Sequence, residues 1–313
     1  MERANQTWMD CFIIKGITDL PELQTPIFIL VFVIYLIILG GNSTLLLLIC
    51  SNQHLRTPMY SFLSNLSVLD MCYTTVTMHK VLLNYLSGDR HVSFSGCLAQ
   101  MYFFVTFLCC EFLLLTAMSY DRYVAICNPL RYQLIMNGSV CAVLMSTCWV
   151  LGFLEVIPAL FIIYDIYCFV SNEINHFFCD LLALMKLFCR NASYMENLIY
   201  SESVIVGFIP FSLIILSYVY IIRAILRIHS NAGRHKAFYT CSSHLMVVCL
   251  LYLTIFCLYM RPTTTFTLDS DKLISLLYTT LTPMLNPLIY SLKNKDIKLA
   301  LKRLMKQNKS ILT

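Results

Sequence analysis

Charged residues are scarce in this sequence. Asp, Glu, Lys and Arg make up 12% of its 313 residues, whereas 58% are hydrophobic. A soluble domain of this length needs a mixed-charge surface, and this composition cannot supply one. The scarcity of charge therefore excludes a soluble globular protein and predicts that lipid solvates much of the chain.

Motifs for catalysis are missing as well. Outside the apolar segments we find no nucleophile with a suitable base, no metal-ligand spacing and no glycine-rich phosphate loop, so we expect neither an enzyme nor a cofactor. The HFFCD string suggests a metal site through His176, Cys179 and Asp180, but a disulfide at Cys179 would remove its thiolate. No internal repeat typical of transporters is found, which leaves a transporter as a weaker alternative.

Seven apolar stretches are each long enough to cross a bilayer, which takes about 20 residues in a helix. The sequence therefore predicts an all-α membrane protein, a bundle of seven transmembrane helices. The expected spans are residues 26–50, 58–79, 98–120, 140–163, 197–222, 238–260 and 273–292.

The basic residues predict the orientation of this bundle in the plasma membrane. Fourteen of the 22 Lys and Arg residues lie on the side that holds the C-terminus, and positively charged loops stay in the cytoplasm. We therefore expect an extracellular segment 1–25, a receptor domain 26–292 and a cytoplasmic tail 293–313. We attribute the net charge of +5 to anionic lipid and a cytoplasmic partner, not to nucleic acid.

The two ends of the chain carry further signals. The first 25 residues are too polar for a cleavable signal peptide, so the first span is expected to direct insertion. In the tail, an amphipathic eighth helix on the inner leaflet is predicted, because its apolar residues share one helical face. These apolar residues are Ile297, Ala300, Leu301 and Leu304.

Topology sorts the 15 cysteines and the glycosylation sequons. Most cysteines lie within spans, but Cys97, Cys168, Cys179 and Cys189 are expected outside the cell, where disulfides persist. Four cysteines permit three pairings. Of the sequons, only Asn5 and Asn191 are exposed to the lumen in this topology, with Asn5 the stronger candidate.

Ionisable groups inside spans are costly, so each is a candidate functional residue. Asp70 and Glu111 are expected to form a polar cluster that holds water or a sodium ion, and no other metal is expected. The alternative is a hydrogen-bond network between helices without an ion. The other expected members are Asn42, Ser119 and Asn286.

Two further features of the spans bear on function. Glu155 and Glu202, in the fourth and fifth spans, could face either a ligand cavity or the outer headgroups. The triplet Asp121-Arg122-Tyr123 ends the third span. Its adjacent opposite charges suit a switch that breaks an ion pair to admit a partner, although anchoring by positive charge is the simpler alternative.

Six strings in order along the chain resemble vertebrate olfactory receptors, a family of rhodopsin-like G-protein-coupled receptors. They run from the first span to the tail. The strings are GN at 41–42, LRTPMYSFLSNLSVLD at 55–70, MSYDRYVAICNPLRY at 118–132, HFFCD at 176–180, KAFYTCSSHL at 236–245 and PMLNPLIYSLKN at 283–294.

The resemblance implies a receptor that binds a small lipophilic odorant and activates a stimulatory, olfactory-type G protein, raising cyclic AMP. It makes residues 121–123 the coupling motif, with the KAFYTCSSHL end of the sixth span as its moving partner. It also implies disulfides between Cys97 and Cys179 and between Cys168 and Cys189. The implied pocket residues are Phe104, Val105, Leu108, Cys109, Glu202, Ser203, Val206, Tyr252, Phe256, Tyr259, Leu276 and Thr279.

Two departures from the family pattern affect these expectations. Leu251-Tyr252-Leu253 replaces the usual Phe-Tyr-Gly, and the step from Cys168 to Cys179 is one residue longer than is common. A rhodopsin-like receptor outside olfaction remains an alternative. Phe104 stands where an amine receptor carries an acid, so a neutral ligand is expected. The last span has no central lysine for retinal.

Overall fold

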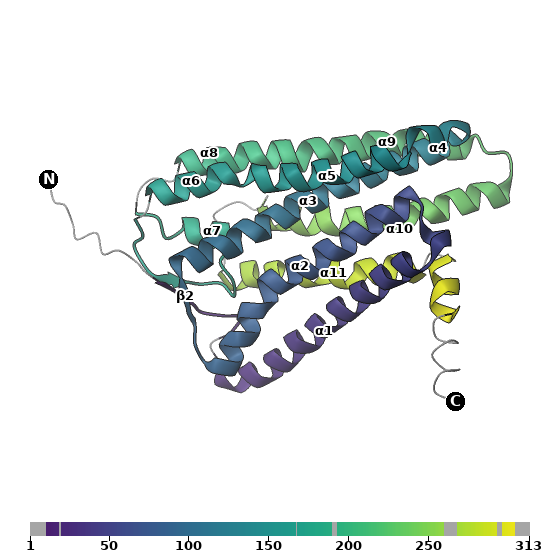
Figure 1. The fold of residues 1–313 in the computed structure, drawn as a ribbon. Coiled ribbons are helices and arrows are strands. Elements are labelled where there is room, and N and C mark those ends of the chain that lie inside the picture. The colour runs from purple at the N-terminus through teal and green to yellow at the C-terminus, as the bar shows by residue number, and fades with distance from the viewer. Residues whose placement is uncertain are drawn as a thin grey trace, which may run out of the picture.

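The structure is a computed structural model of the chain, and it describes residues 11–18, 20–166, 168–189, 193–259, 268–292 and 296–303. Its long helical segments form the bundle of seven predicted from the sequence (Figure 1). In chain order the spans are α1 (Pro21–Ser51), α2 (Pro58–Ser87), α3 (Phe94–Cys127), α5 with α6 (Gly138–Glu155 and Ile157–Ile166), α8 with η3 and α9 (Ser193–Glu202, Ser203–Phe208 and Ile209–Leu226), α10 (Asn231–Tyr259) and α11 (Leu268–Leu292).

Most helices extend beyond the apolar spans expected from the sequence, and local signals explain where several of them begin. Ser93 caps α3 by accepting a hydrogen bond from the amide of Gly96, and Asn137 caps α5 by accepting one from Val140. Such caps satisfy amides that have no partner within the helix. Pro58 stands at the first position of α2, where proline's missing N–H costs nothing.

Two spans are not regular helices. The fourth span breaks between α5 and α6, one residue before Ile157-Pro158. The fifth span contains η3, a stretch of π-helix that ends just before Pro210. Proline removes one backbone hydrogen bond and crowds the preceding turn, which accounts for the irregular segment next to each proline.

Among the described helices, five are long and apolar enough by length and composition to cross a membrane: α1, α3, α5 with α6, α8 to α9, and α10. The other two spans are α2 and α11. These carry a large share of the buried polar side chains, including Asp70, Thr74 and Thr77 on α2 and Thr279 and Asn286 on α11. Their polarity follows from facing the bundle interior.

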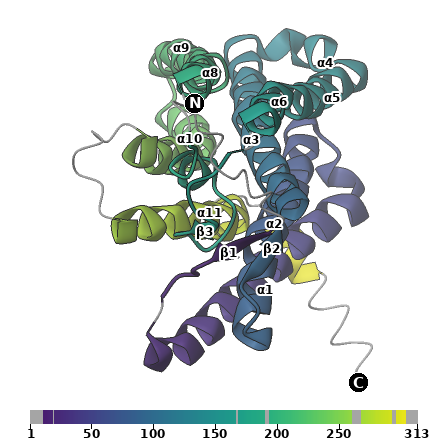
Figure 2. The same ribbon diagram turned by 90° about the vertical axis from the view of Figure 1, so that its left-hand side faces the viewer.

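A small sheet, which the sequence analysis did not predict, covers one end of the bundle (Figure 2). Strand β1 (Cys11–Ile14) pairs antiparallel with β2 (His91–Ser93) and parallel with β3 (Glu173–Ile174). The side chains of Phe12 and Ile14, both in β1, are fully buried. We call this the sheet end of the bundle, and the opposite end the tail end.

Short helices complete the fold. At the tail end, η1 (Gln53–Leu55) lies between α1 and α2, and η2 (Pro129–Arg131) and α4 (Tyr132–Ile135) lie between α3 and α5; at the sheet end, α7 (Leu181–Met185) follows β3. Residues 296–303 form the tail helix, which crosses the end of the bundle (Figure 1). Ile297 and Ala300 are buried, whereas Lys298, Lys302 and Arg303 are exposed. Leu304 lies outside the described residues.

Candidate functional site

The tail end of α3 carries a buried ion pair. Asp121 is fully buried and lies 3.2 Å from the guanidinium of Arg122. The Tyr132 hydroxyl on α4 donates a 2.7 Å hydrogen bond to the same carboxylate. Burial and the neighbouring Asp121 carboxylate raise the pKa of Tyr132, so its phenol stays protonated and can donate. Both carboxylate oxygens of Asp121 are thus directed at groups that hold this end closed.

A second link joins three spans just above this ion pair. The hydroxyl of Tyr218 on α9 lies 2.9 Å from Nδ1 of His244 on α10, and Nε2 of His244 lies 3.0 Å from the Leu115 carbonyl on α3. A carbonyl only accepts, so Nε2 carries a proton. The Tyr218 hydroxyl also lies 3.1 Å from the Cys241 carbonyl, so its single proton is shared between that oxygen and Nδ1 of His244. The fully buried imidazole therefore ties α10 to α3 and α9.

The predicted polar cluster is brought together only in part. The Asn286 amide donates to both oxygens of Asp70 (3.2 and 3.0 Å), which joins α11 to α2. Asn42 instead donates to the carbonyls of Ile38 and Pro283 (3.1 and 3.0 Å). Ser119 bonds within its own helix, to the Thr116 carbonyl at 2.8 Å.

Glu111, on α3, is the remaining member of this cluster. It adds a second carboxylate, so hydrogen-bond acceptors outnumber donors. It lies near enough to Asp70 for their charges to interact, and it also interacts with Asn286. One oxygen each of Asn42, Glu111 and Asn286 is buried without a hydrogen-bond partner in the structure. Two neighbouring carboxylates cannot both stay ionised in a low dielectric unless a cation compensates them; otherwise one of them takes a proton. The oxygen donors match a hard cation such as sodium.

The predicted pocket residues on α3 and the fifth span are largely enclosed. Leu108, Cys109 and Val206 are buried, Val105 and Glu202 are half-buried, and Ser203 is exposed. Phe104 is also buried, but its ring packs among the rings of Tyr73, Phe178 and Tyr278, with centroids 4.7 to 6.0 Å away. Phe104 thus closes the sheet end of this region.

Carboxylates from two spans approach Cys109. Its thiol donates to Glu155 at 3.1 Å. The charge of Glu202 also acts on Cys109, and the charge of Glu155 acts on Glu202. Among the described residues, one oxygen of Glu202 is buried without a hydrogen-bond partner. Glu155, for which the sequence left open a ligand cavity or the outer headgroups, is half-buried and accepts the hydrogen bond from Cys109 on α3.

The predicted pocket residues on α10 and α11 vary in burial. Tyr252 contacts the ring of Phe112 (centroids 5.0 Å apart), and its hydroxyl donates to the Gly207 carbonyl at 3.3 Å. Thr279 is fully buried, Leu276 is half-buried and Phe256 is 59% exposed. The side chain of Tyr259 lies outside the described residues, as do Asn5 and Asn191.

Disulfides hold the loops over this region. Cys97 at the start of α3 is bonded to Cys179, and Cys168 is bonded to Cys189, each with Cα atoms 5.3 Å apart. Asp180 accepts hydrogen bonds from the amides of Leu182 and Ala183 and so caps α7. The metal site suggested by HFFCD is excluded by these partners. Among the described residues, no group of three His, Cys, Asp or Glu side chains is arranged to hold a metal ion.

Three residues that form hydrogen bonds at the tail end were not predicted from the sequence: Tyr132, Tyr218 and His244. Tyr132 and His244 lie within strings that carried the family resemblance, but neither string shows which partner each side chain contacts. Tyr218 lies in an otherwise apolar stretch. Its polar atom in a lipid-embedded span was the available signal, because a buried hydroxyl usually finds a partner.

Comparisons with known proteins match the whole bundle. A family model described as "Olfactory receptor" matches residues 31–308. Olfactory receptor 13C9 of Homo sapiens is 45% identical over 311 residues, which cover 97% of this chain and 98% of that protein. Olfactory receptor 8G50 of Mus musculus is 43% identical over 309 residues, which cover 99% of each chain.

These matches confirm the resemblance found in the sequence, and they exclude an enzyme and a transporter. They agree with a bundle of seven spans whose buried ion pair lies at one end and whose disulfide-held loops lie at the other. The chain therefore belongs to the olfactory receptor family, the multi-pass G-protein-coupled receptors of the plasma membrane that bind odorants.

Proposed function

We propose that an odorant held between α3, the fifth span and α10 activates a stimulatory, olfactory-type G protein and so raises cyclic AMP. The observation that carries this proposal is the double closure of the tail end. Arg122 is paired with Asp121, and His244 ties α10 to α3. An activating ligand has to bind the receptor more tightly when these links are open than when they are closed. Only such a difference in affinity shifts the equilibrium between the closed and open states.

Tyr252 connects the proposed pocket to this closure. It packs on Phe112 and Phe211, and it lies two helical turns from His244 on the same helix, α10. A ligand that displaces the Tyr252 ring moves α10 as a rigid helix. That movement breaks the hydrogen bond to the Leu115 carbonyl and frees Arg122 for the G protein.

The proposed ligand is a small, largely apolar odorant with one hydrogen-bond donor. Leu108 and Val206 offer apolar contacts, and the buried oxygen of Glu202 has no partner in the structure to compete with the ligand. Proposed pocket members are Phe104, Val105, Leu108, Cys109, Glu202, Ser203, Val206, Tyr252, Phe256, Tyr259, Leu276 and Thr279.

We place the sheet end outside the cell and the tail end in the cytoplasm, with residues 26–292 as the receptor domain. Disulfides at the sheet end fit an oxidising compartment. Lys298, Lys302 and Arg303 are exposed on the tail helix, where they would meet anionic lipid. In this orientation Asn5 and Asn191 remain the predicted glycosylation sites.

The polar cluster is proposed to hold a sodium ion or a proton with water in the closed state. Asp70, Glu111 and the amide oxygens of Asn42 and Asn286 would be the ligands. Either occupant neutralises one of the two buried carboxylates. Raising sodium in the medium should then lower ligand-independent signalling.

The proposal is tested in cells that display the chain on their surface and co-express either an olfactory-type stimulatory G protein or an inhibitory one. A broad panel of odorants is screened, with cyclic AMP as the readout. We expect a dose-dependent rise that requires the stimulatory partner. A fall in cyclic AMP, or a response only with the inhibitory partner, would contradict the proposed coupling.

A further inference from the structure

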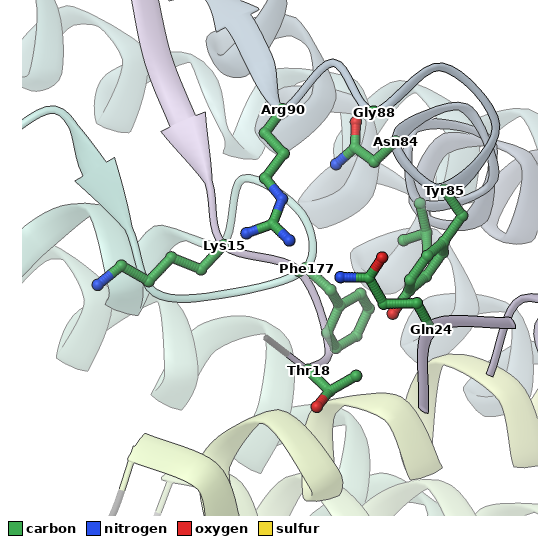
Figure 3. Close-up of a pocket in the computed structure, with 10 residues that line it drawn as sticks. Lys15, Thr18, Gln24, Asn84, Tyr85, Gly88, Arg90 and Phe177 are labelled. Atoms are coloured by element: carbon green, nitrogen blue, oxygen red, sulfur yellow. The ribbon is translucent and has the colours of Figure 1, made fainter. Parts of the chain in front are cut away.

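Two separate cavities open at the sheet end of the bundle. One encloses about 260 Å³ between the segment after β1, the start of α1 and the end of α2, where Gln24, Tyr85 and Phe177 lie close together (Figure 3). The other measures about 400 Å³ and lies between α2 and the first turns of α3, and it shares no lining residue with the first. We call this second cavity the outer groove. Its lining residues are Thr75, Val76, His79, Lys80, Val92, Gly96, Ala99, Gln100 and Phe103.

The outer groove opens away from the interior of the bundle. On α2, Thr74, Thr77 and Met78 are buried, whereas Thr75 and His79 are exposed. Residues three or four positions apart share one face of a helix, so these two sets form different faces of α2. The groove belongs to the exposed face, and it is therefore part of the outer surface of the bundle.

The groove lies where lipid chains give way to lipid headgroups. His79 is the last residue of the apolar stretch that forms the second span, and Lys80 is the first residue beyond it. Phe103 lies inside the third apolar stretch and is 40% exposed, so its ring contacts lipid chains. A lysine at such a boundary extends its ammonium to the headgroups. In the orientation proposed above, this boundary belongs to the outer leaflet.

Lys80 gives the groove a positive charge. Its ammonium donates to the backbone carbonyls of His91 at 2.8 Å and of Asp89 at 3.5 Å. An ammonium has three N–H donors, so these two carbonyls leave one donor for a ligand, and they do not neutralise the charge. The Asp89 carboxylate is attracted to Lys80, but its hydrogen bonds at 2.9 Å are with the amide and Nδ1 of His91.

His79 adds a hydrogen-bond donor beside Lys80. It is exposed, and its ring makes no hydrogen bond or ion pair with the described part of the chain. An imidazole carries at least one N–H in either protonation state, so His79 can donate to an anion whether or not it is charged. None of the described residues that line the groove is acidic. This end of the groove therefore favours an anionic group.

The rest of the groove is apolar. Val76, Ala99 and the ring of Phe103 line it. Gln100 also lines it, but its amide group is already occupied, because it donates to the Val76 carbonyl at 2.7 Å and accepts from the Cys179 amide at 3.0 Å. The apolar part of the groove therefore matches a hydrocarbon chain.

We propose that the outer groove binds a glycerophospholipid of the outer leaflet, with its phosphate on Lys80 and His79 and one acyl chain against Ala99 and Phe103. The charge of the groove favours this occupant over two others. A sterol has no anionic group for Lys80. A second copy of the chain, seated symmetrically, would bring two positive ends together, which costs free energy.

The size of the groove agrees with this occupant. Ligand pockets usually measure about 300–1,000 Å³, and the groove is within that range. It is large enough for the glycerol phosphate and the upper part of one chain. A lipid bound there contacts α2 and α3 together, so it stabilises the sheet end by mass action. The proposal rests on the proposed orientation but not on the odorant pocket, so its test needs no odorant.

The test uses the full chain in detergent micelles, and bound lipid is counted by native mass spectrometry. The probe is dioleoylphosphatidylcholine, and dioleoylglycerol is its counterpart with the same chains but no phosphate. We expect the phospholipid to bind at least about tenfold more tightly, because only its phosphate forms charge-assisted hydrogen bonds with Lys80. Equal binding of the two lipids, or tighter binding of cholesterol, would overturn the proposal.

A charge variant locates the phosphate. Lys80→Gln should weaken binding of the phospholipid about tenfold. The matched control is Lys15→Gln at the same end of the bundle, which should change binding less than about twofold, because the Lys15 ammonium pairs with Glu173 at 3.0 Å. Equal losses in the two variants would indicate a general effect of surface charge and would overturn the site.

A steric variant locates the acyl chain and keeps the proposal testable if Lys80→Gln does not fold. Ala99→Phe fills the groove and should abolish the tight binding. Ala142 is an exposed alanine on α5, outside the groove, and Ala142→Phe should bind the phospholipid as the wild type does. Unchanged binding in Ala99→Phe, or an equal loss in both alanine variants, would overturn the proposal.

Discussion

At the level of single residues, Tyr218 and His244 form the hydrogen bonds that link three spans near the tail end. The imidazole is fully buried and can satisfy both nitrogens only while α9, α10 and α3 stay together. If these helices separate, the buried polar atoms lose the partners that they have in the closed state. The closed state is therefore stabilised by a buried link between three spans.

Replacing Tyr218 with Phe should raise ligand-independent cyclic AMP. The change deletes the hydroxyl that hydrogen-bonds with His244 and the Cys241 carbonyl. A lost hydrogen bond costs about 1 kcal/mol, which corresponds to roughly a fivefold shift toward the open state. Tyr220→Phe is the matched control, because Tyr220 is 47% exposed on the same helix. Basal signalling that stays equal in both variants at equal surface display would contradict the role of this link.

At the tail end, the charged residues of the ion pair could be predicted from the sequence, whereas the tyrosines near it could not. Asp121 and Arg122 stand out because they are adjacent opposite charges at the end of an apolar span. Tyr218 and Tyr132 do not stand out, since 19 tyrosines are spread along the sequence. Helix rotation and the path of the loop decide which tyrosine contacts Asp121 or His244, and local sequence spacing encodes neither.

At the scale of elements, close packing between helices depends on a few glycines. On α5, Gly152 faces α3, and a Cβ built there would lie 3.0 Å from the Thr106 carbonyl and would overlap the Cys110 sulfur. Small residues at such positions let membrane helices approach closely. By contrast, nothing lies within 4 Å of a Cβ built at Gly40 on α1.

We expect Gly152→Ala to reduce the folded receptor at the cell surface, because overpacking against a backbone carbonyl costs about 1–3 kcal/mol. Quantitative surface staining and thermal unfolding of the solubilised chain measure the effect. Gly40→Ala should match the wild-type protein in both assays. Equal stability of the two variants would show that α3 and α5 do not pack as described.

The sheet is the element that sequence analysis could not predict. Its strands hold four, three and two residues, too few for an alternating pattern to be recognised. Their pairing joins the segment before α1 to two separate loops. The helices were predictable because each span needs a long apolar run, although their polar extensions and the break at Val156 were not.

The loop that contains β3 is anchored to the start of α3 by the disulfide between Cys179 and Cys97. Cys179→Ser should block surface delivery, since removing a native disulfide costs about 2–5 kcal/mol. Cys50→Ser changes a free, exposed cysteine and serves as the control. Normal trafficking of the Cys179 variant would argue that the sheet end folds without this bond.

For the whole molecule, composition and span count established the bundle, and ordered strings established the family. The ligand-binding surfaces were less predictable. Phe104 packs in an aromatic cluster, and Phe256 is largely exposed. Cavities form where several elements meet, so their lining depends on the relative rotation of helices and not on any one segment.

The most direct test of the account is odorant-stimulated cyclic AMP in Arg122→Ala, measured beside wild-type receptor and Arg56→Ala in cells with an olfactory-type G protein. Arg56 is an exposed arginine at the same end of the bundle. We predict that Arg122→Ala reaches the surface but gives no response, while Arg56→Ala responds as the wild type does. An undiminished response in Arg122→Ala would contradict the proposed switch.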